Sequence, residues 1–236
     1  MSFKRKIVVV TGAAGNVGRA VCRLLAEREA RVAAVDTLDA PLREAVAALP
    51  HAGQHLAVSG VDLLDPASCT AFVERVLREL GPIDGALNTV GGFAMAALDA
   101  AGPELWDQMF GLNLKSALNL YRAVIPGMRA ARRGSLVAIG AAAALRAPAQ
   151  MGAYAASKGA VLRLTESFAD ELKADGIRVN AVLPGTIDTP QNRAAMPDAD
   201  PALWVKPIEV AEAILFLLSD AASGVSGALL PVGGRS

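Results

Sequence analysis

Hydrophobic positions along the chain form short continuous runs that alternate with longer stretches of helical period. Continuous apolar runs of this length are typical of strands buried on both faces. The pattern predicts about seven strands, at residues 6–10, 31–35, 55–61, 85–88, 135–139, 178–183 and 228–232. It predicts helices between them, at residues 19–29, 42–49, 66–80, 104–131, 152–175 and 208–218.

Regular alternation of strands and helices is typical of right-handed β-α-β units, which place the strands side by side in a parallel sheet. We therefore expect residues 1–236 to form one α/β domain, a doubly wound sheet with helices on both faces. The least regular segment is 185–207, which is rich in proline and acidic residues. Long loops in compact domains usually serve function, so we interpret this segment as a substrate loop with room for a short helix.

Composition excludes several classes of protein. The 236 residues carry 23 basic and 23 acidic side chains, so no basic excess points to nucleic acid. The longest uncharged apolar stretch, 135–145, is too short to cross a bilayer, and residues 1–6 lack the pattern of a signal peptide. The two cysteines, Cys22 and Cys69, lie far apart, which favours a reduced cytoplasmic protein.

A glycine-rich turn follows the first strand and opens the first helix. It runs Thr11-Gly12-Ala13-Ala14-Gly15-Asn16-Val17-Gly18. Glycines let the backbone turn tightly and approach a pyrophosphate, while the start of the helix offers free N–H groups and a positive dipole end. In this strand–turn–helix context the turn predicts dinucleotide binding through Gly12, Gly15, Asn16, Val17 and Gly18.

Asp36 ends the second strand, about twenty residues after the turn, where a carboxylate can accept hydrogen bonds from ribose hydroxyls. The same carboxylate repels a 2′-phosphate, and neither Thr37 nor Leu38 brings a positive charge. We therefore expect NAD(H) as the favoured cofactor, with NADP(H) as the alternative. No metal site is expected.

Tyr154 and Lys158 are four residues apart on a predicted helix and so share one face. A phenol titrates near pH 10, but a neighbouring ammonium favours its ionised form. Tyr154 is thus a candidate to exchange a proton with a substrate while hydride moves to or from nicotinamide. Lys158 is also a candidate to hydrogen-bond the nicotinamide ribose.

These motifs, in this order and spacing, resemble the short-chain dehydrogenase/reductase family over nearly the whole chain. Further matching segments are Asp62-Leu63, Asn88-Thr89-Val90-Gly91, Asn113 and Pro184-Gly185-Thr186-Ile187-Asp188-Thr189-Pro190. The resemblance implies a Rossmann fold and a homodimer or homotetramer joined through helices 104–131 and 152–175.

The resemblance also implies roles for individual residues. Asp62 and Leu63 would hold the adenine, and Asn88, Val90 and Gly91 would line the cofactor cleft. Asn113 would anchor a water that links Lys158 to solvent as a proton relay. Ile187 and Thr189, beyond Pro184 and Gly185, would hold the nicotinamide carboxamide.

The sequence departs from the family pattern at two positions. Asn16 occupies the place of the middle glycine in the turn, with Gly15 one residue earlier. The family's catalytic serine should lie thirteen residues before Tyr154, and that position is Ala141. Ser135 lies at the wrong end of its strand to replace it. Loss of one oxyanion-type donor costs about 3–4 kcal/mol of transition-state stabilisation, so an already activated substrate is expected.

One branch of the family, the quinonoid dihydropteridine reductases, lacks that serine. The chain resembles it in the Gly-x-x-Gly-x-x-Gly turn, in Gly91-Gly92-Phe93 and in the segment from Leu183 to Asp200. A quinonoid dihydropterin regains aromatic character on reduction, and Tyr154 alone can supply its proton. Substrate contacts are expected from a group of apolar side chains around the reacting centre, namely Phe93, Ala141, Met151, Met196 and Trp204.

Three functions remain open at this point. The first is reduction of a small activated C=N or C=O substrate such as a quinonoid dihydropterin. The second is a general carbonyl or alcohol dehydrogenase in which another group replaces the serine. The third is a weakly catalytic dinucleotide-binding sensor, against which Tyr154, Lys158 and Asn113 argue, because a pure binder needs no proton relay.

Overall fold

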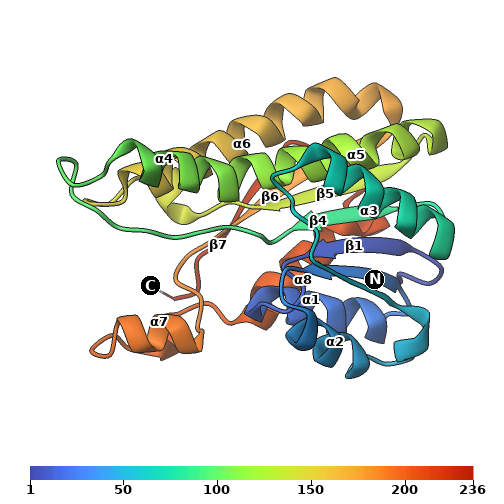
Figure 1. The fold of residues 1–236 in the computed structure, drawn as a ribbon, viewed down its shortest axis with the longest axis horizontal. Coiled ribbons are helices and arrows are strands. Elements are labelled where there is room, and N and C mark those ends of the chain that lie inside the picture. Colours follow the sequence, from blue (N-terminus) through green and yellow to red (C-terminus); the bar gives the residue numbers. More distant parts are fainter. Residues whose placement is uncertain (236) are drawn as a thin grey trace.

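Seven parallel strands form one sheet at the centre of the computed structural model, which describes residues 1–235 (Figure 1). The strands are β1 (Ile7–Thr11), β2 (Arg31–Asp36), β3 (Leu56–Ser59), β4 (Gly85–Asn88), β5 (Gly134–Ile139), β6 (Ile177–Pro184) and β7 (Leu229–Val232). Their order across the sheet is β3-β2-β1-β4-β5-β6-β7. The predicted doubly wound α/β fold is therefore confirmed.

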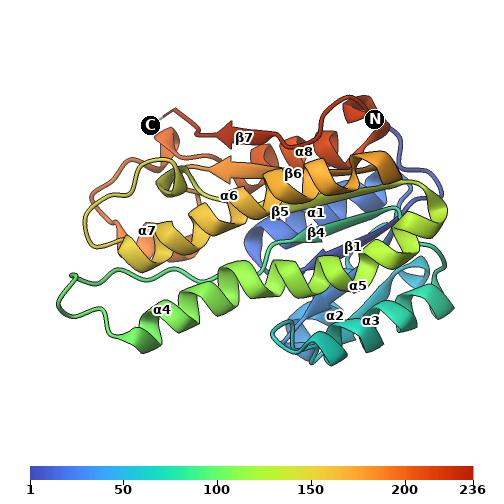
Figure 2. The same ribbon diagram turned by 90° about the horizontal axis from the view of Figure 1, so that it is seen from above.

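Helices cover both faces of the sheet (Figures 1 and 2). The helices are α1 (Asn16–Glu27), α2 (Asp39–Ala47), α3 (Pro66–Glu79), α4 (Pro103–Phe110), α5 (Ser116–Ala131), α6 (Gly152–Leu172), α7 (Pro190–Ala195) and α8 (Pro207–Leu218). One layer contains α3, α4, α5 and α6, and the opposite layer contains α1, α2 and α8. The short α7 stands apart from both layers, next to the start of α1.

Two hydrophobic cores lie on the two faces, because successive strand side chains point to opposite sides. In β1, Ile7 and Val9 belong to the core under α3, α5 and α6, whereas Val8 and Val10 belong to the core over α1, α2 and α8. All five residues of β1 are buried. This two-sided burial explains why the strands appear in the sequence as unbroken apolar runs.

The strand order places the site. The chain moves outward from β1 in one direction through β2 and β3, then returns to β4 on the other side of β1. In open α/β sheets, ligands bind beyond the carboxyl ends of the strands at such a reversal. Thr11 at the end of β1 pairs with Asn88 at the end of β4, so the glycine-rich turn and the segment after Asn88 meet at this edge.

Helix boundaries differ from the sequence-based prediction in two informative places. The first helix begins at Asn16, three residues before the predicted start, because the last part of the glycine-rich segment is already helical. The predicted helix at 104–131 is interrupted by a π-helical turn at Gly111–Lys115, between α4 and α5. Such turns recur at functional sites, and this one contains Asn113.

The irregular segment 185–207 contains the short α7 and a 3-10 turn at Pro201–Leu203, as the predicted loop with a short helix allows. None of the helices described within residues 1–235 is both long and apolar enough to cross a membrane.

Candidate active site

The glycine-rich turn is held in shape by contacts that leave no room for side chains. Gly12 adopts a φ of +62°, and a Cβ on it would lie 2.4 Å from Thr89 Oγ1. A Cβ on Gly18 would lie 2.1 Å from the Gly12 carbonyl oxygen, so α1 can pack on the turn only with glycine there. Glycine at these two positions allows the close backbone approach that a pyrophosphate-binding turn requires.

Asp36 braces the same turn from the end of β2. Its Oδ2 accepts a hydrogen bond from the Ala14 N–H at 3.0 Å, and its Oδ1 accepts from the Leu38 N–H at 3.3 Å. The carboxylate is half-buried and borders a cavity of about 240 Å³. Asp36 therefore links the shape of the turn to the place where an adenosine ribose would lie.

The surfaces around this cavity fit a dinucleotide. No side chain caps the N-terminus of α1, so its first N–H groups remain available to phosphate oxygens. The cavity is mostly apolar, as a flat adenine ring requires, with two carboxylates at its rim. Its lining comprises Val35, Asp36, Thr37, Val61, Asp62, Leu63, Leu64, Val90, Leu112 and Ser116. Asp36, Asp62, Leu63 and Val90, which the sequence predicted for this cofactor, lie together here.

Six of these lining residues were not predicted from the sequence: Val35, Thr37, Val61, Leu64, Leu112 and Ser116. The first four each lie directly beside a predicted position, so adjacency was a usable signal. Leu112 lies in the π-helical turn and Ser116 directly follows it, and only the fold brings that turn beside the segment after β3.

Asn88 acts mainly as a brace. Its Oδ1 accepts a hydrogen bond from Thr11 Oγ1 at 2.7 Å, and its Nδ2 lies 3.2 Å from both the Val90 carbonyl oxygen and Ser116 Oγ. These bonds join the carboxyl ends of β1 and β4 to α5. Asn88 thus holds the floor of the cleft with its side chain buried, and any cofactor contact from it stays a prediction.

Asn113 lies at the junction between the cleft and α6. Its Oδ1 accepts from the Gly92 N–H at 2.9 Å, while its Nδ2 donates to the Gly92 carbonyl at 3.1 Å and to Ser157 Oγ at 2.9 Å. A Cβ on Gly91 would lie 2.6 Å from Asn113 Oδ1 and 3.1 Å from Lys158 Nζ. Because Gly91 has no side chain, Asn113 Oδ1 and Lys158 Nζ can both lie close to its backbone. The water relay between them stays a prediction.

Lys158 is buried on α6, and its Nζ donates to the Ile139 carbonyl oxygen at 2.8 Å, at the end of β5. Burial lowers the pKa of Lys158 to about 8, because an ammonium loses its hydration there.

Burial also raises the pKa of Tyr154 above its ordinary value. The expectation that Lys158 lowers this pKa is therefore not met, because desolvation of the phenolate is the dominant effect. Tyr154 is thus held as a neutral phenol, ready to donate a proton.

Ala141 lies just beyond β5, buried and in extended conformation. Ser135 is at the amino end of the same strand, where its hydroxyl donates to the Leu217 carbonyl. Ser157 is near Tyr154, but its Oγ donates to the Tyr154 carbonyl at 2.7 Å and accepts from Asn113. Neither serine can take the place of a hydroxyl at residue 141.

The predicted substrate residues have unequal positions. The ring of Phe93 lies edge-on to that of Tyr154, with centroids 4.9 Å apart and planes at 78°. Phe93 is 59% exposed and Met196, at the end of α7, is 38% exposed, so both can meet a ligand. Met151 caps α6 one turn before Tyr154. Trp204 is only 5% exposed, so its ring mainly supports the segment after β6.

We refer to residues 186–205, which follow Pro184, as the lid; that they cover a substrate stays a prediction. Backbone bonds from the Asp188 N–H to the Val205 carbonyl and from the Val205 N–H to the Thr186 carbonyl close its base. Gly185 packs against Gly233, where a Cβ would lie 2.8 Å from the carbonyl oxygen. Thr189 Oγ1 accepts from the Asn192 N–H, and the Ile187 carbonyl accepts from Asn192 Nδ2. Nicotinamide contacts from Ile187 and Thr189 stay predictions.

The comparisons with known proteins agree with this geometry. Residues 6–200 match the short chain dehydrogenase family. The chain is 33% identical to 2,3-dihydro-2,3-dihydroxybenzoate dehydrogenase of Bacillus subtilis, over 94% of this chain and 92% of that protein. It is 33% identical to 3-oxoacyl-acyl-carrier-protein reductase of Thermotoga maritima, over 99% and 98%.

Among solved structures, an NAD⁺-bound xylitol dehydrogenase superposes with a TM-score of 0.91 at 27% identity, covering 99% of this chain and 100% of that one. The names of these relatives are those of alcohol and carbonyl enzymes, not of dihydropteridine reductases. Matches of this extent show the family and its NAD(P)-dependent redox chemistry. The chain belongs to the short-chain dehydrogenase/reductase family.

Proposed function

We propose that this enzyme interconverts a small secondary alcohol and its ketone with NAD(H), using Tyr154 as the side chain that exchanges the substrate proton. The observation that carries the proposal is the pair on α6: the half-buried phenol of Tyr154, one turn from the buried Lys158, whose Nζ donates to the Ile139 carbonyl oxygen. The named relatives, which include a dihydrodiol dehydrogenase, a ketoacyl reductase and a xylitol dehydrogenase, support an alcohol or carbonyl substrate.

The bound dinucleotide supplies or accepts the hydride. The protein's own residues do the rest of the work. The glycine-rich turn and the uncapped start of α1 would hold the phosphates, and Asp36 would accept hydrogen bonds from the ribose and disfavour a 2′-phosphate. In reduction the Tyr154 hydroxyl donates a proton to the carbonyl oxygen, and in oxidation the phenolate removes one from the alcohol. Lys158 Nζ and Asn113 Oδ1 both lie beside Gly91, so Lys158 would connect Tyr154 to Asn113 in a proton relay.

The missing hydroxyl at Ala141 shapes the substrate range. Because residue 141 is alanine and offers no second hydroxyl to the substrate oxygen, ketones that are already activated should react best. Phe93 and Met196 favour an apolar substrate body. The direction of the Tyr154 pKa shift implies that reduction persists through neutral pH, while oxidation rises with pH as the phenol ionises.

The test is a panel of secondary alcohols and ketones, assayed with NAD(H) and NADP(H) side by side across pH 6 to 10. The proposal expects turnover of cyclic or activated ketones with NADH exceeding that with NADPH. Absence of turnover with every alcohol and ketone of the panel, despite NADH binding, would contradict it.

A second candidate is reduction of an activated C=N substrate such as a quinonoid dihydropterin. The observation that favours it is Ala141 itself, because a substrate that regains aromatic character needs only one proton donor. Stopped-flow oxidation of NADH by freshly generated quinonoid dihydropterin tests it. Turnover no faster than the uncatalysed reaction would remove this candidate.

A further inference from the structure

Asn16 has a contact that the proposed function does not use. It is the first residue of α1, exposed, at the position where the family pattern has glycine. Its Nδ2 donates a hydrogen bond to Gln191 Oε1 at 3.1 Å. Gln191 is the second residue of α7, so this bond joins the phosphate-binding turn to the lid across 175 positions of sequence. A glycine at residue 16 has no side chain and cannot form it.

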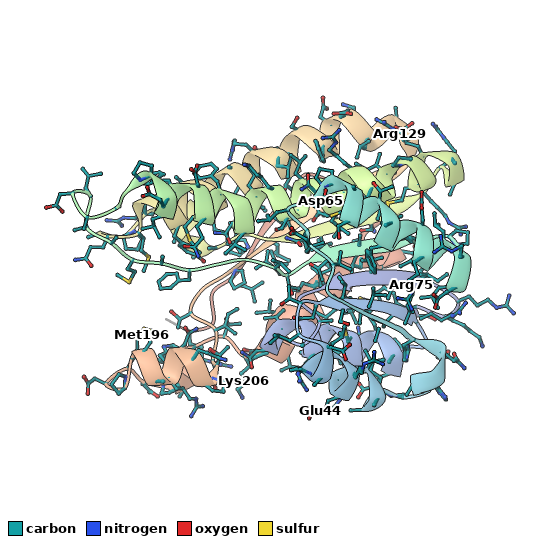
Figure 3. The ribbon with its side chains drawn as sticks, in the orientation of Figure 1. Glu44, Asp65, Arg75, Arg129, Met196 and Lys206 are labelled. Atoms are coloured by element: carbon teal, nitrogen blue, oxygen red, sulfur yellow. The ribbon has the colours of Figure 1, made fainter. Side chains whose placement is uncertain are left out.

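The lid carries Gln191 as part of a stiff unit. Arg193 donates to both carboxylate oxygens of Asp188, from Nε at 2.6 Å and from the terminal nitrogen at 2.9 Å. Thr189 caps the first turn of α7. Met196 at the end of α7 and Lys206 at the base of the lid bracket this unit in Figure 3. Gln191 therefore belongs to a turn of helix that is linked to Asp188 and Thr189 by side-chain hydrogen bonds.

The bond to Asn16 is the single polar tie between these two parts. Within residues 1–235, no other hydrogen bond or ion pair joins the lid to residues 12–18. The tie starts from the uncapped end of α1, the place that offers N–H groups to phosphates. Both partners are neutral amides, so the tie adds no charge that would repel a pyrophosphate.

We propose that Asn16 and Gln191 form a latch that holds the lid against the phosphate-binding turn and slows release of the dinucleotide. The inference rests on the proposed binding of NAD(H) at this turn. Opening the lid requires this bond to break, and an exposed neutral hydrogen bond changes such an equilibrium roughly 2- to 10-fold. Asn16 and Gln191 are then positioning residues, acting through the lid and not on the substrate.

The first test needs no cofactor. Hydrogen exchange of the α7 amides is measured for the parent, Asn16→Ala, Gln191→Ala and Gln191→Glu. Each alanine variant should exchange roughly 2- to 10-fold faster at residues 191–195, because the lid opens more often. Gln191→Glu keeps an acceptor for Asn16 Nδ2 and should exchange like the parent. Unchanged exchange in both alanine variants would overturn the latch.

The second test measures NADH dissociation by stopped-flow displacement with excess NAD⁺. Each alanine variant should release NADH roughly 2- to 10-fold faster, and the double variant should be no faster than the faster single one, because both lose the same bond. Gln54→Ala, an exposed glutamine before β3, is the matched control and should match the parent. Effects that multiply in the double variant would overturn the latch. A parent that binds no NADH contradicts the proposed function instead, and the exchange experiment still decides the latch.

Discussion

The two halves of the cleft are built by different rules. The dinucleotide half is over-determined: Gly12 and Gly18 fit only as glycines, Asp36 bonds to the turn, and Asn88 ties β1 to β4. The substrate half is sparse: residues 141–144 are all alanine, Phe93 is largely exposed, and α7 is attached through its base and one amide pair. Cofactor geometry is thus fixed by packing, whereas substrate choice depends on a few replaceable side chains.

The largest effect should come from the residue that both halves share. Tyr154→Phe removes the proton donor and should lower kcat/KM about 10²- to 10⁴-fold, the usual contribution of general acid–base catalysis. NADH affinity, measured by fluorescence titration, should change little because the dinucleotide half is intact.

Tyr121→Phe is the matched control, since Tyr121 is the only other tyrosine and its buried hydroxyl has no hydrogen-bond partner within the described residues. It should keep full activity. Equal losses in the two variants would remove the assigned role of Tyr154.

Lys158 should lower the folding stability of the protein while being required for its activity. Its pKa falls from 10.5 to about 8 on folding, which corresponds to about 3 kcal/mol of stability lost at neutral pH. This loss is complete below pH 8, diminishes as pH rises towards 10.5, and vanishes above it. Cofactor-free Lys158→Met should therefore unfold at higher urea concentration than the parent at pH 7 and lose most activity.

Lys173, an exposed lysine paired with Asp170, supplies the control for that experiment. Lys173→Met should change the urea midpoint of unfolding little, both at pH 7 and at pH 10. If Lys158→Met is destabilised at pH 7 and equally so at pH 10, desolvation of the ammonium does not govern this position.

Cofactor selectivity tests the dinucleotide half alone. Asp36→Ala removes a carboxylate that can accept charge-assisted hydrogen bonds from the ribose, which are worth about 1.5–3 kcal/mol each. The ratio of kcat/KM for NADH over NADPH should fall about 10- to 100-fold. A parent enzyme that prefers NADPH would show that Asp36 serves only to hold the backbone N–H groups of Ala14 and Leu38.

The smallest effect should come from the substrate half. A preorganised oxyanion-type donor is worth about 3–4 kcal/mol, but a serine placed at residue 141 without packing built to orient it should recover only an ordinary hydrogen bond, about 0.5–1.5 kcal/mol. Reduction of an unactivated ketone by Ala141→Ser should therefore rise about 2- to 10-fold. Reduction of an activated substrate should change less, because its barrier depends less on that donor. A fall in ketone reduction would mean that another group already occupies this role.

Much of the fold could be predicted from the sequence because the patterns that specify strands and the glycine-rich turn lie within short segments of the chain. Apolar runs buried on both faces identified all seven strands within a few residues, and Gly12, Gly18 and Asp36 identified the turn. The π-helical turn at Gly111–Lys115 was not predictable, since apolar periodicity continues through it. We attribute this turn to tertiary contacts, because the Asn113 side chain hydrogen-bonds to the backbone N–H and carbonyl of Gly92 and to Ser157 Oγ.

The candidate site was predicted unevenly for the same reason. Tyr154 and Lys158 lie one turn apart on α6, so their spacing is visible in the chain. The direction of the Tyr154 pKa shift depends on burial, which spacing does not report. The hydrogen bond between Asn16 and Gln191 joins positions 175 residues apart, and neither residue type by itself predicts the contact.

The division of the interior into two cores has a consequence for how the enzyme can diversify. Both cores are formed by the sheet and by α1, α2, α3, α5, α6 and α8, while α4 and α7 contribute no buried residue to either. Replacements around Phe93 or along residues 188–203 therefore leave nearly all of the folding energy untouched. Substitutions in these peripheral segments can therefore change the substrate while the dinucleotide site, Tyr154 and Lys158 stay the same.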